Sequence, residues 1–300
     1  MASLLATAFS AFFRTTGLLR RGFAGGDNFE KRIRLSRAVP LPLPTARMRA
    51  RLKVAETAFD GRAVWTIAPK DRAPSAHLLY FHGGGYVAGP VSIHWDFLAK
   101  MAQKHGFAIT APLYPLSPEA RAEEITAFGL KIYQQFIALH NGPFFMGGDS
   151  AGGGLTAAVA QAARDAGLRP ASGLLMICPW LDAAAVHADQ PALEKRDIIL
   201  SIDGIRQAGK LYAGEMPIAD PRVSPIHGDW NNLPPILCFG GGDDLLVTDA
   251  RALKAKLPQV EYIEGAELMH VWPIMPFSDA GPARQRIADF AAQFAVSTNL

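Results

Sequence analysis

The stretch that decides the fold is FFMGGDSAGGGLTAAVAQAARDAG, residues 144–167. It begins as an apolar run of strand length, passes through the pentapeptide GDSAG at 148–152, and continues as an alanine-rich pattern typical of a helix. The arrangement G-x-S-x-G places a serine on a tight strand-to-helix turn, with its hydroxyl exposed at the N-terminus of the helix. The same residues could form a plain glycine-rich turn, but their position between a predicted strand and a predicted helix favours Ser150 as a nucleophile.

Short apolar runs of the same kind recur on both sides of this stretch, and helical patterns lie between most of them. Runs that are apolar on both faces and separated by helices indicate an α/β fold, with a mainly parallel sheet and helices on both faces. Segment 187–220 interrupts the alternation, and we interpret it as an insertion above the sheet. The predicted strands are 63–69, 77–81, 107–114, 143–148, 172–180, 235–241 and 259–265, and the predicted helices are 93–105, 119–140, 151–166 and about 282–295.

A second glycine-rich loop follows the predicted strand of LLYFHGGGYVAG, residues 78–89. Three consecutive glycines expose bare backbone, so a ligand can approach the main chain closely. A serine that attacks a carbonyl carbon creates an oxyanion, and backbone N–H groups aimed at that oxyanion stabilise it. We therefore expect Gly83 and Gly84 to donate to the oxyanion, with the N–H of Ala151 as a third donor.

A dinucleotide site is the alternative interpretation of this loop. Gly83-x-Gly85-x-x-Ala88 matches the glycine fingerprint of such sites, including its permitted final alanine. However, Gly89-Pro90 interrupts the stretch where the cofactor helix would continue, and no acidic residue ends a strand about twenty residues later, as ribose binding requires. The loop therefore favours anion stabilisation.

Two further clusters follow predicted strands near the C-terminus. LCFGGGDDLLVTDA, residues 237–250, offers Asp243, Asp244 and Asp249. EGAELMHVWP, residues 264–273, offers His270. A carboxylate after a strand can orient an imidazole and stabilise its charged form, although helix capping is an equal interpretation of such aspartates. Neither a D-x-D-x-D-G loop nor a histidine pair accompanies them, which disfavours a metal site. The chain order serine, aspartate, histidine is the order of α/β hydrolases.

The N-terminal segment is strongly basic. Residues 1–53 contain eleven Lys and Arg against only Asp27 and Glu30, whereas the whole chain carries +3. We expect this arm to lie against the acidic remainder of its own chain rather than on nucleic acid or a membrane. We interpret the first helical segment as one apolar stripe that packs on the protein, and a mitochondrial-type presequence is the alternative interpretation. The stripe consists of residues that recur at helical spacing: Leu4, Leu5, Ala8, Phe9, Phe12 and Phe13.

Composition and cysteine usage indicate a packed protein whose two cysteines are thiols, with a disulfide bridge between them as the alternative. The chain is 49% apolar and 19% charged and has no low-complexity tract, which excludes disorder over most of its length. Cys178 and Cys238 both lie in apolar runs and are predicted to be buried thiols, as in a reducing compartment. The first apolar run stops at Arg14, too short to span a bilayer, and its charges follow it, unlike those of a secretory signal. We therefore expect a cytoplasmic protein without stable membrane insertion.

Several blocks of the sequence, taken together, resemble one known family. HGGGYVAG, GDSAGG, YPLSPEARAEE, CPWLD, DPRVSP and LPPILCFGGGDDLLVTDA occur in this order over roughly residues 63–295. They are similar to blocks of the hormone-sensitive-lipase-like carboxylesterases, which have the α/β-hydrolase fold. The family usually has D-P-L-x-D-E where this chain has Asp244-Leu245-Leu246-Val247-Thr248-Asp249. Asp244 therefore aligns with the catalytic position, and the missing proline keeps Asp243 as an alternative.

The resemblance implies a serine carboxylesterase that hydrolyses short- to medium-chain esters through an acyl-enzyme. Ser150 would be the nucleophile, His270 the general base and Asp244 its orienting carboxylate. Residues 1–50 would form an N-terminal cap segment on a catalytic domain at 51–300, completed by the cap insertion at about 187–220. The partner would be a small-molecule ester, with no nucleic acid, no metal and no organic cofactor, and relatives often form homodimers through their last strand. A lactone or amide hydrolase, or a receptor on the same scaffold, are the alternatives.

Overall fold

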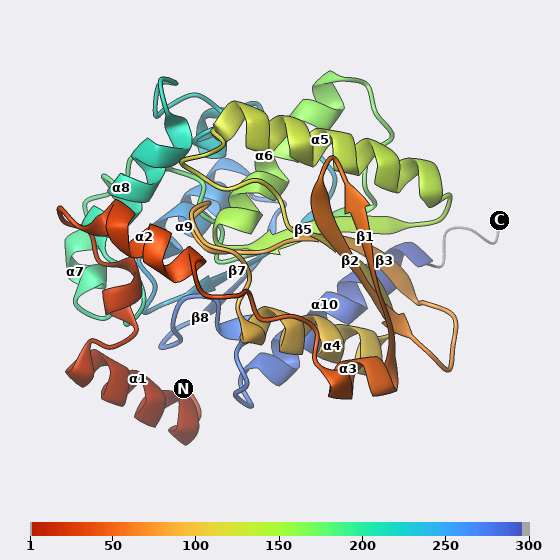
Figure 1. The fold of residues 1–300 in the computed structure, drawn as a ribbon, viewed down its shortest axis with the longest axis horizontal. Helices are drawn as coiled ribbons and strands as arrows, with labels where there is room; N and C mark the ends of the chain where they lie inside the picture. Colours follow the sequence, from red (N-terminus) through yellow and green to blue (C-terminus); the bar gives the residue numbers. More distant parts are fainter. Residues whose placement is uncertain (1, 296–300) are drawn as a thin grey trace.

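The computed structural model describes residues 2–295 and is built around one eight-stranded sheet (Figure 1). The strand order is β1-β2-β4-β3-β5-β6-β7-β8. β2 pairs antiparallel with β1 and with β4, and all other pairs are parallel, which confirms the predicted mainly parallel sheet. The last residues of the predicted catalytic domain, 296–300, lie outside the described residues. The strands are β1 Leu52–Phe59, β2 Arg62–Pro69, β3 Ala76–Phe81, β4 Phe107–Pro112, β5 Phe144–Asp149, β6 Gly173–Ile177, β7 Ile236–Gly241 and β8 Glu261–Gly265.

All seven predicted strands are present, and β1 is the strand that the sequence pattern did not predict. Its residues are mostly exposed because β1 lies at the edge of the sheet and has one neighbour. It therefore lacks the two-sided apolar run that marks the central strands. The central strands alternate between two cores: Leu79, Met146 and Cys238 face one, whereas Leu78 and Leu237 face the other.

Helices cover both faces of the sheet, as predicted. α5 and α6 lie on one face, whereas α4 and α10 lie on the other (Figure 1). α9 packs on the α5 and α6 face and was not predicted, since its residues were considered only as loop and cap positions. The bounds are α4 Ser92–His105, α5 Ala122–Leu139, α6 Ala151–Asp165, α9 Val247–Lys256 and α10 Ala280–Ala295.

The N-terminal segment and the insertion meet at one end of the sheet, where α1, α2, α7 and α8 gather on the left of Figure 1. This is the end at which the parallel strands terminate. Segment 187–220 contains no strand, as expected, and folds into α7 Gln190–Glu194 and α8 Ile202–Ala213. The N-terminal helices are α1 Leu4–Thr16, η1 Arg20–Phe23, α2 Phe29–Arg37 and α3 Ala46–Arg51, and residues 39–45 connect α2 to α3 without regular structure.

The basic arm lies against its own chain, as expected. Arg14 pairs with Asp243 at 3.0 Å, and Arg37 pairs with Glu119. Arg20 donates to the backbone carbonyls of Glu194 and Asp197. These contacts tie α1, η1 and α2 to the loop after β7, to the loop before α5 and to the insertion.

The predicted single apolar stripe of α1 is wrong in one respect, because only part of it is buried. Phe9 packs edge-on against Phe277 at 5.0 Å between ring centroids, and Phe13 lies beside Phe9. Leu4 and Phe12, by contrast, are 90% and 55% exposed. The apolar positions span more of the helix circumference than one contact face can cover.

Both cysteines are buried free thiols, as predicted. Among residues 2–295, no helix combines the length and the apolar character that crossing a bilayer requires.

Candidate active site

Ser150 occupies a strained turn between β5 and α6. Its backbone has φ 53° and ψ −121°, a conformation that residues other than glycine rarely adopt. The turn is held on both sides, since the N–H of Ser150 donates to Ile177 and its carbonyl accepts from Trp180 and Gly154. Such strain is typical of a nucleophile elbow, because it lifts the hydroxyl clear of the strand and places it at the helix N-terminus.

The glycines that flank Ser150 are required by close contacts. A Cβ at Gly148 would lie 2.4 Å from the carbonyl oxygen of Phe81, and a Cβ at Gly152 would lie 2.0 Å from the same atom. The end of β3 therefore packs directly against the turn. This explains why the pattern needs glycine on each side of the serine.

Asp244 and His270 form a buried hydrogen-bonded pair beside this turn. The Nδ1 of His270 lies 2.9 Å from Oδ2 of Asp244, while Oδ1 of Asp244 accepts the N–H of Leu246 at 2.8 Å. Asp244 is fully buried. Burial alone lowers the pKa of His270, but the charge of Asp244, with smaller contributions from Asp197 and Asp149, raises it above its usual value. The pair can therefore hold a proton on the imidazole.

The other two aspartates of the cluster have different partners. Asp243 is partly buried and pairs with Arg14 and Arg196, at 3.0 and 3.4 Å. Asp249 is buried and accepts the N–H groups of Leu181 and Asp182, and burial raises its pKa to about 7. Of the three aspartates, Asp244 is thus the one that contacts the imidazole.

A cavity of about 520 Å³ brings Ser150 and His270 to a common space. No hydrogen bond joins the Ser150 hydroxyl to His270 in the part of the chain that the structure describes. In ligand-free hydrolases such bonds are often long and shorten when substrate binds. The cavity is strongly apolar, and its wall includes Phe9, Leu19 and Phe23 from the N-terminal segment and Ile199, Leu200 and Ile205 from the insertion.

The glycine loop after β3 requires one correction to the sequence-based prediction. The N–H of Gly83 donates to Oδ1 of Asp149 at 3.0 Å, so it is not free to bind an oxyanion. Gly84 and Gly85 line the cavity, whereas Gly83 does not. Within the described residues, the N–H groups of Gly84, Gly85 and Ala151 have no acceptor in the protein. The sequence could not distinguish these glycines, because the difference arises from a side chain 66 residues away.

Asp149, next to Ser150, fixes the glycine loop in place. Its carboxylate accepts from the Tyr80 hydroxyl at 2.6 Å and from Gly83, and it lies 3.2 Å from Nε2 of His94. Burial raises the pKa of Asp149, but His94 and Tyr80 outweigh it, so the pKa lies below its usual value. Asp149 raises the pKa of His94 in turn. His94 was not among the candidates predicted from the sequence, yet it supports the site through this ion pair.

His82, the first residue of the glycine motif, is a structural residue. Its ring stacks on Tyr114 with centroids 4.3 Å apart, and its Nδ1 lies 2.6 Å from the carbonyl oxygen of Gly83. Burial lowers the pKa of His82 to about 4, so the ring stays neutral at physiological pH. A neutral ring with Nδ1–H donating to Gly83 holds the loop without adding charge to the cavity.

One group of metal-ligating residue types is present among residues 2–295. Cys178, Asp244 and His270 offer ligand atoms within 4.8 Å of one another. The Nδ1 of His270 is already bonded to Asp244, and burial raises the pKa of the Cys178 thiol well above its usual value. The geometry therefore favours a hydrogen-bonded Asp–His pair over metal ligation.

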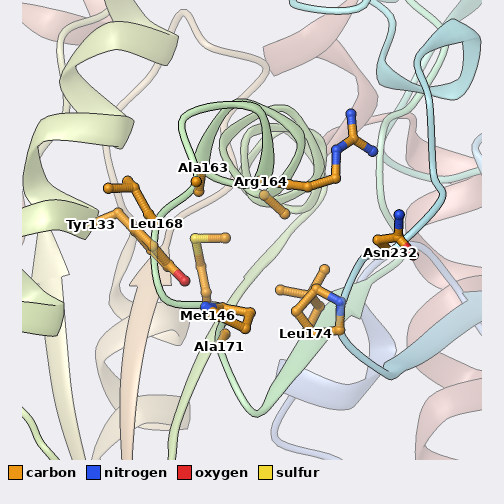
Figure 2. A pocket seen from close by; sticks show the side chains of 12 residues that line it. Tyr133, Met146, Ala163, Arg164, Leu168, Ala171, Leu174 and Asn232 are labelled. Atoms are coloured by element: carbon orange, nitrogen blue, oxygen red, sulfur yellow. The ribbon is translucent and has the colours of Figure 1, made fainter.

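Another cavity, of about 200 Å³, lies near the C-terminal end of α6 (Figure 2). Met146, Leu168 and Leu174 form much of its wall, and Figure 2 shows the guanidinium of Arg164 turned away from them. Its lining contains no serine, cysteine, histidine or carboxylate, so of these two cavities the one at Ser150 is the one that combines a serine with a histidine.

The chain is similar to known hydrolases over most of its length. A family model described as alpha/beta hydrolase fold matches residues 78–274, which include Ser150, Asp244 and His270. An acetyl-hydrolase of Streptomyces hygroscopicus is 33% identical over 210 residues, covering 66% of this chain and 70% of the relative. An esterase of Acinetobacter venetianus is 27% identical over 238 residues, covering 77% and 78%.

A solved structure extends the similarity to the whole described chain. An esterase from the bacterial hormone-sensitive lipase family superimposes with a TM-score of 0.80 at 25% sequence identity. The superposition covers 98% of this chain and all of the other. The N-terminal segment and the insertion therefore have counterparts in that structure.

Proposed function

We propose that this chain acts through a Ser150-His270-Asp244 triad on short- to medium-chain esters. The chain belongs to the α/β hydrolase family, in its hormone-sensitive-lipase-like branch, and is a carboxylic ester hydrolase. The observation that carries the proposal is the buried His270–Asp244 pair, whose imidazole shares a cavity with a serine on a strained elbow. A triad is recognised by this geometry and by the roles of its members.

In the first half of the reaction, Oγ of Ser150 attacks the ester carbonyl carbon while Nε2 of His270 takes the hydroxyl proton. Asp244 holds the imidazole by its Nδ1–H and stabilises the imidazolium that forms. The tetrahedral intermediate collapses, the C–O bond to the alcohol breaks, and the alcohol leaves with the proton from His270. Water then attacks the acyl-enzyme by the same steps and releases the carboxylic acid.

The oxyanion of each tetrahedral intermediate would be held by the N–H groups of Gly84, Gly85 and Ala151. All three lack an acceptor among residues 2–295, and two lie on a loop anchored through Gly83 to Asp149. Ala151 adds the N-terminus of α6, whose dipole favours negative charge. Preorganised donors of this kind need no rearrangement as charge develops.

Replacing Gly85 with alanine is expected to lower kcat by about 100-fold or more, as loss of one oxyanion donor does. Gly85 has φ +62°, where an alanine is strained, and an added Cβ would lie 2.3 Å from the ring of Phe23, so either the loop or the Phe23 side chain must move. Gly167→Ala is the matched control, because Gly167 has φ +65° but open space around it. Esterase kinetics should show kcat unchanged in the control, and an unchanged kcat in Gly85→Ala would contradict the assignment.

The N-terminal segment 1–50 and the insertion at 187–220 are proposed to form the cap over the acyl site. Phe23 packs near Gly85, and the carbonyl of Phe23 accepts from the Ser201 hydroxyl at 3.0 Å, so the two segments are joined. On the other side, Tyr212 of α8 stacks on Tyr86 of the glycine loop with centroids 3.6 Å apart. The apolar side chains of both segments line the cavity and would hold the acyl chain.

Replacing Phe9 with alanine is expected to raise KM for p-nitrophenyl hexanoate by about tenfold, which corresponds to the loss of one or two buried methylene contacts. The effect on p-nitrophenyl acetate should be small, because a two-carbon acyl group does not reach the cap. Phe12→Ala, on the exposed face of the same helix, is the control and should leave both KM values unchanged. Equal changes for both esters in Phe9→Ala would exclude the acyl-pocket role.

The proposal as a whole is tested by a fluorophosphonate probe and a panel of substrates. The probe should label Ser150, whereas a receptor on the same scaffold would stay unlabelled. Turnover of p-nitrophenyl esters from acetate to decanoate, compared with matched lactones and anilides, should be fastest for short- to medium-chain esters. A clear preference for the lactone or the anilide would replace the ester assignment with one of its alternatives on the same triad.

A further inference from the structure

A buried carboxylate outside every recognised motif lies close to the Asp244–His270 pair. Asp197 belongs to the insertion, follows α7 and is 2% exposed. Its Oδ1 accepts the N–H groups of Ile199 and Leu200, at 2.7 and 2.8 Å, and its Oδ2 accepts the N–H of Leu245 at 2.7 Å. Three charge-assisted hydrogen bonds to backbone are a strong arrangement for an ionised carboxylate in a buried position.

The donors to Asp197 come from two functional segments. Leu245 directly follows Asp244, and the next N–H, that of Leu246, donates to Asp244 itself. The loop that carries the triad acid is thus held by two carboxylates in succession. Ile199 and Leu200 line the cavity that contains Ser150. One side chain therefore connects the wall of the acyl pocket to the loop that positions Asp244.

Asp197 also interacts electrostatically with the pair. Burial, followed by the charge of Asp244, raises the pKa of Asp197 to about 6, while His270 opposes this. The groups that face His270 are Asp244, Asp197 and Asp149, together with the protonated thiol of Cys178. The three carboxylates all favour the imidazolium form of His270, and Asp197 is the one that comes from the insertion.

We propose that Asp197 is a positioning residue of the esterase reaction, which orients the Asp244 loop and the acyl-pocket wall together and stabilises the charged imidazole that forms during catalysis. This inference rests on the proposed triad. It means that the insertion contributes to the chemistry as well as to the shape of the pocket.

The test is the pH profile of kcat/KM for p-nitrophenyl butyrate in Asp197→Asn. The amide removes the charge and turns an NH2 toward the N–H of Leu245, so kcat/KM on the plateau should fall about tenfold. His270 must be neutral to accept the proton, and with one fewer anion nearby its pKa falls. The acid limb of the profile should therefore move to lower pH, by about half a unit.

Asp249→Asn is the matched control, since Asp249 is also a buried aspartate bonded to backbone N–H groups but does not act on His270. Its acid limb should stay at the wild-type pH. A purely structural role for Asp197 predicts lower stability with an unshifted acid limb, and that result would overturn the proposal.

A second variant covers the case in which Asp197→Asn does not fold. Asp197→Glu keeps the charge but displaces it, so the acid limb should stay near the wild-type pH while kcat falls and KM for longer acyl chains rises. Wild-type kcat and KM in this variant would overturn the positioning role. Labelling of wild-type Ser150 by a fluorophosphonate separates failure of the proposed triad from failure of the Asp197 proposal. If Ser150 is not labelled, the triad itself is rejected. If Ser150 is labelled but the acid limb of Asp197→Asn does not shift, only the role of Asp197 is rejected.

Discussion

Replacing Ser150 with alanine is expected to reduce kcat for p-nitrophenyl acetate by about 10⁶-fold, since removal of a triad serine costs nearly as much as removal of the whole triad. The residual rate would come from the oxyanion donors and substrate binding, which stay in place. The substitution removes only one hydroxyl group, from a residue that is 8% exposed, so the fold should persist. Circular dichroism and thermal unfolding would confirm that the protein is folded.

His270→Ala is the companion variant and should be impaired to a similar degree, because the two residues act as a unit. The double variant Ser150→Ala, His270→Ala should be no worse than either single one. Additive losses would show that the two side chains act separately, and turnover that persists in Ser150→Ala would mean that another nucleophile performs the reaction.

Replacing Asp244 with asparagine is expected to lower kcat by about 10⁴-fold, because an amide in this position favours the wrong imidazole tautomer. Asp244 is fully buried, and its carboxylate accepts hydrogen bonds from Nδ1 of His270 and from the N–H of Leu246. The measurement is kcat for p-nitrophenyl acetate at neutral and at alkaline pH.

Asp243→Asn provides a control at the neighbouring position. Its carboxylate pairs with Arg14 and Arg196 at the surface, and exposed pairs of this kind contribute up to about 1 kcal/mol to stability. Its kcat should stay within about twofold of wild type. The reverse pattern, with Asp243→Asn impaired and Asp244→Asn active, would transfer the acid role to Asp243.

The sheet and its covering helices could be predicted from sequence because their signals are local. Two-sided apolar runs marked seven of the strands, and the alanine-rich pattern after Ser150 marked α6. β1 was not predicted because an edge strand buries few of its residues. α9 was not predicted because it follows a cluster of aspartates and its residues were considered only as loop and cap positions. Local pattern is informative only where burial constrains residue type on a regular period.

The candidate site residues could also be predicted from the sequence, since each follows a strand and the three occur in a known order. The choice between neighbouring residues of the same type could not be predicted. Gly83 and Gly84 look alike in the sequence. In the described residues, however, the carboxylate of Asp149 accepts the N–H of Gly83, whereas the N–H of Gly84 has no acceptor. The sequence pattern of α1 also predicts one apolar surface, yet Phe9 packs against Phe277 while Phe12 is exposed.

The sequence by itself determined the order of elements, the candidates for nucleophile, base and acid, and the need for bare backbone beside them. These follow from chain-local chemistry: strand periodicity, the glycines that permit a strained turn, and residue types that can carry protons. Only the tertiary structure decided which N–H groups are free, that Asp243 faces Arg14 while Asp244 faces His270, and that Asp197 reaches the Asp244 loop. Those outcomes depend on hydrogen-bond partners that lie tens to hundreds of residues apart, and a partner that distant is set by packing in three dimensions rather than by any local pattern.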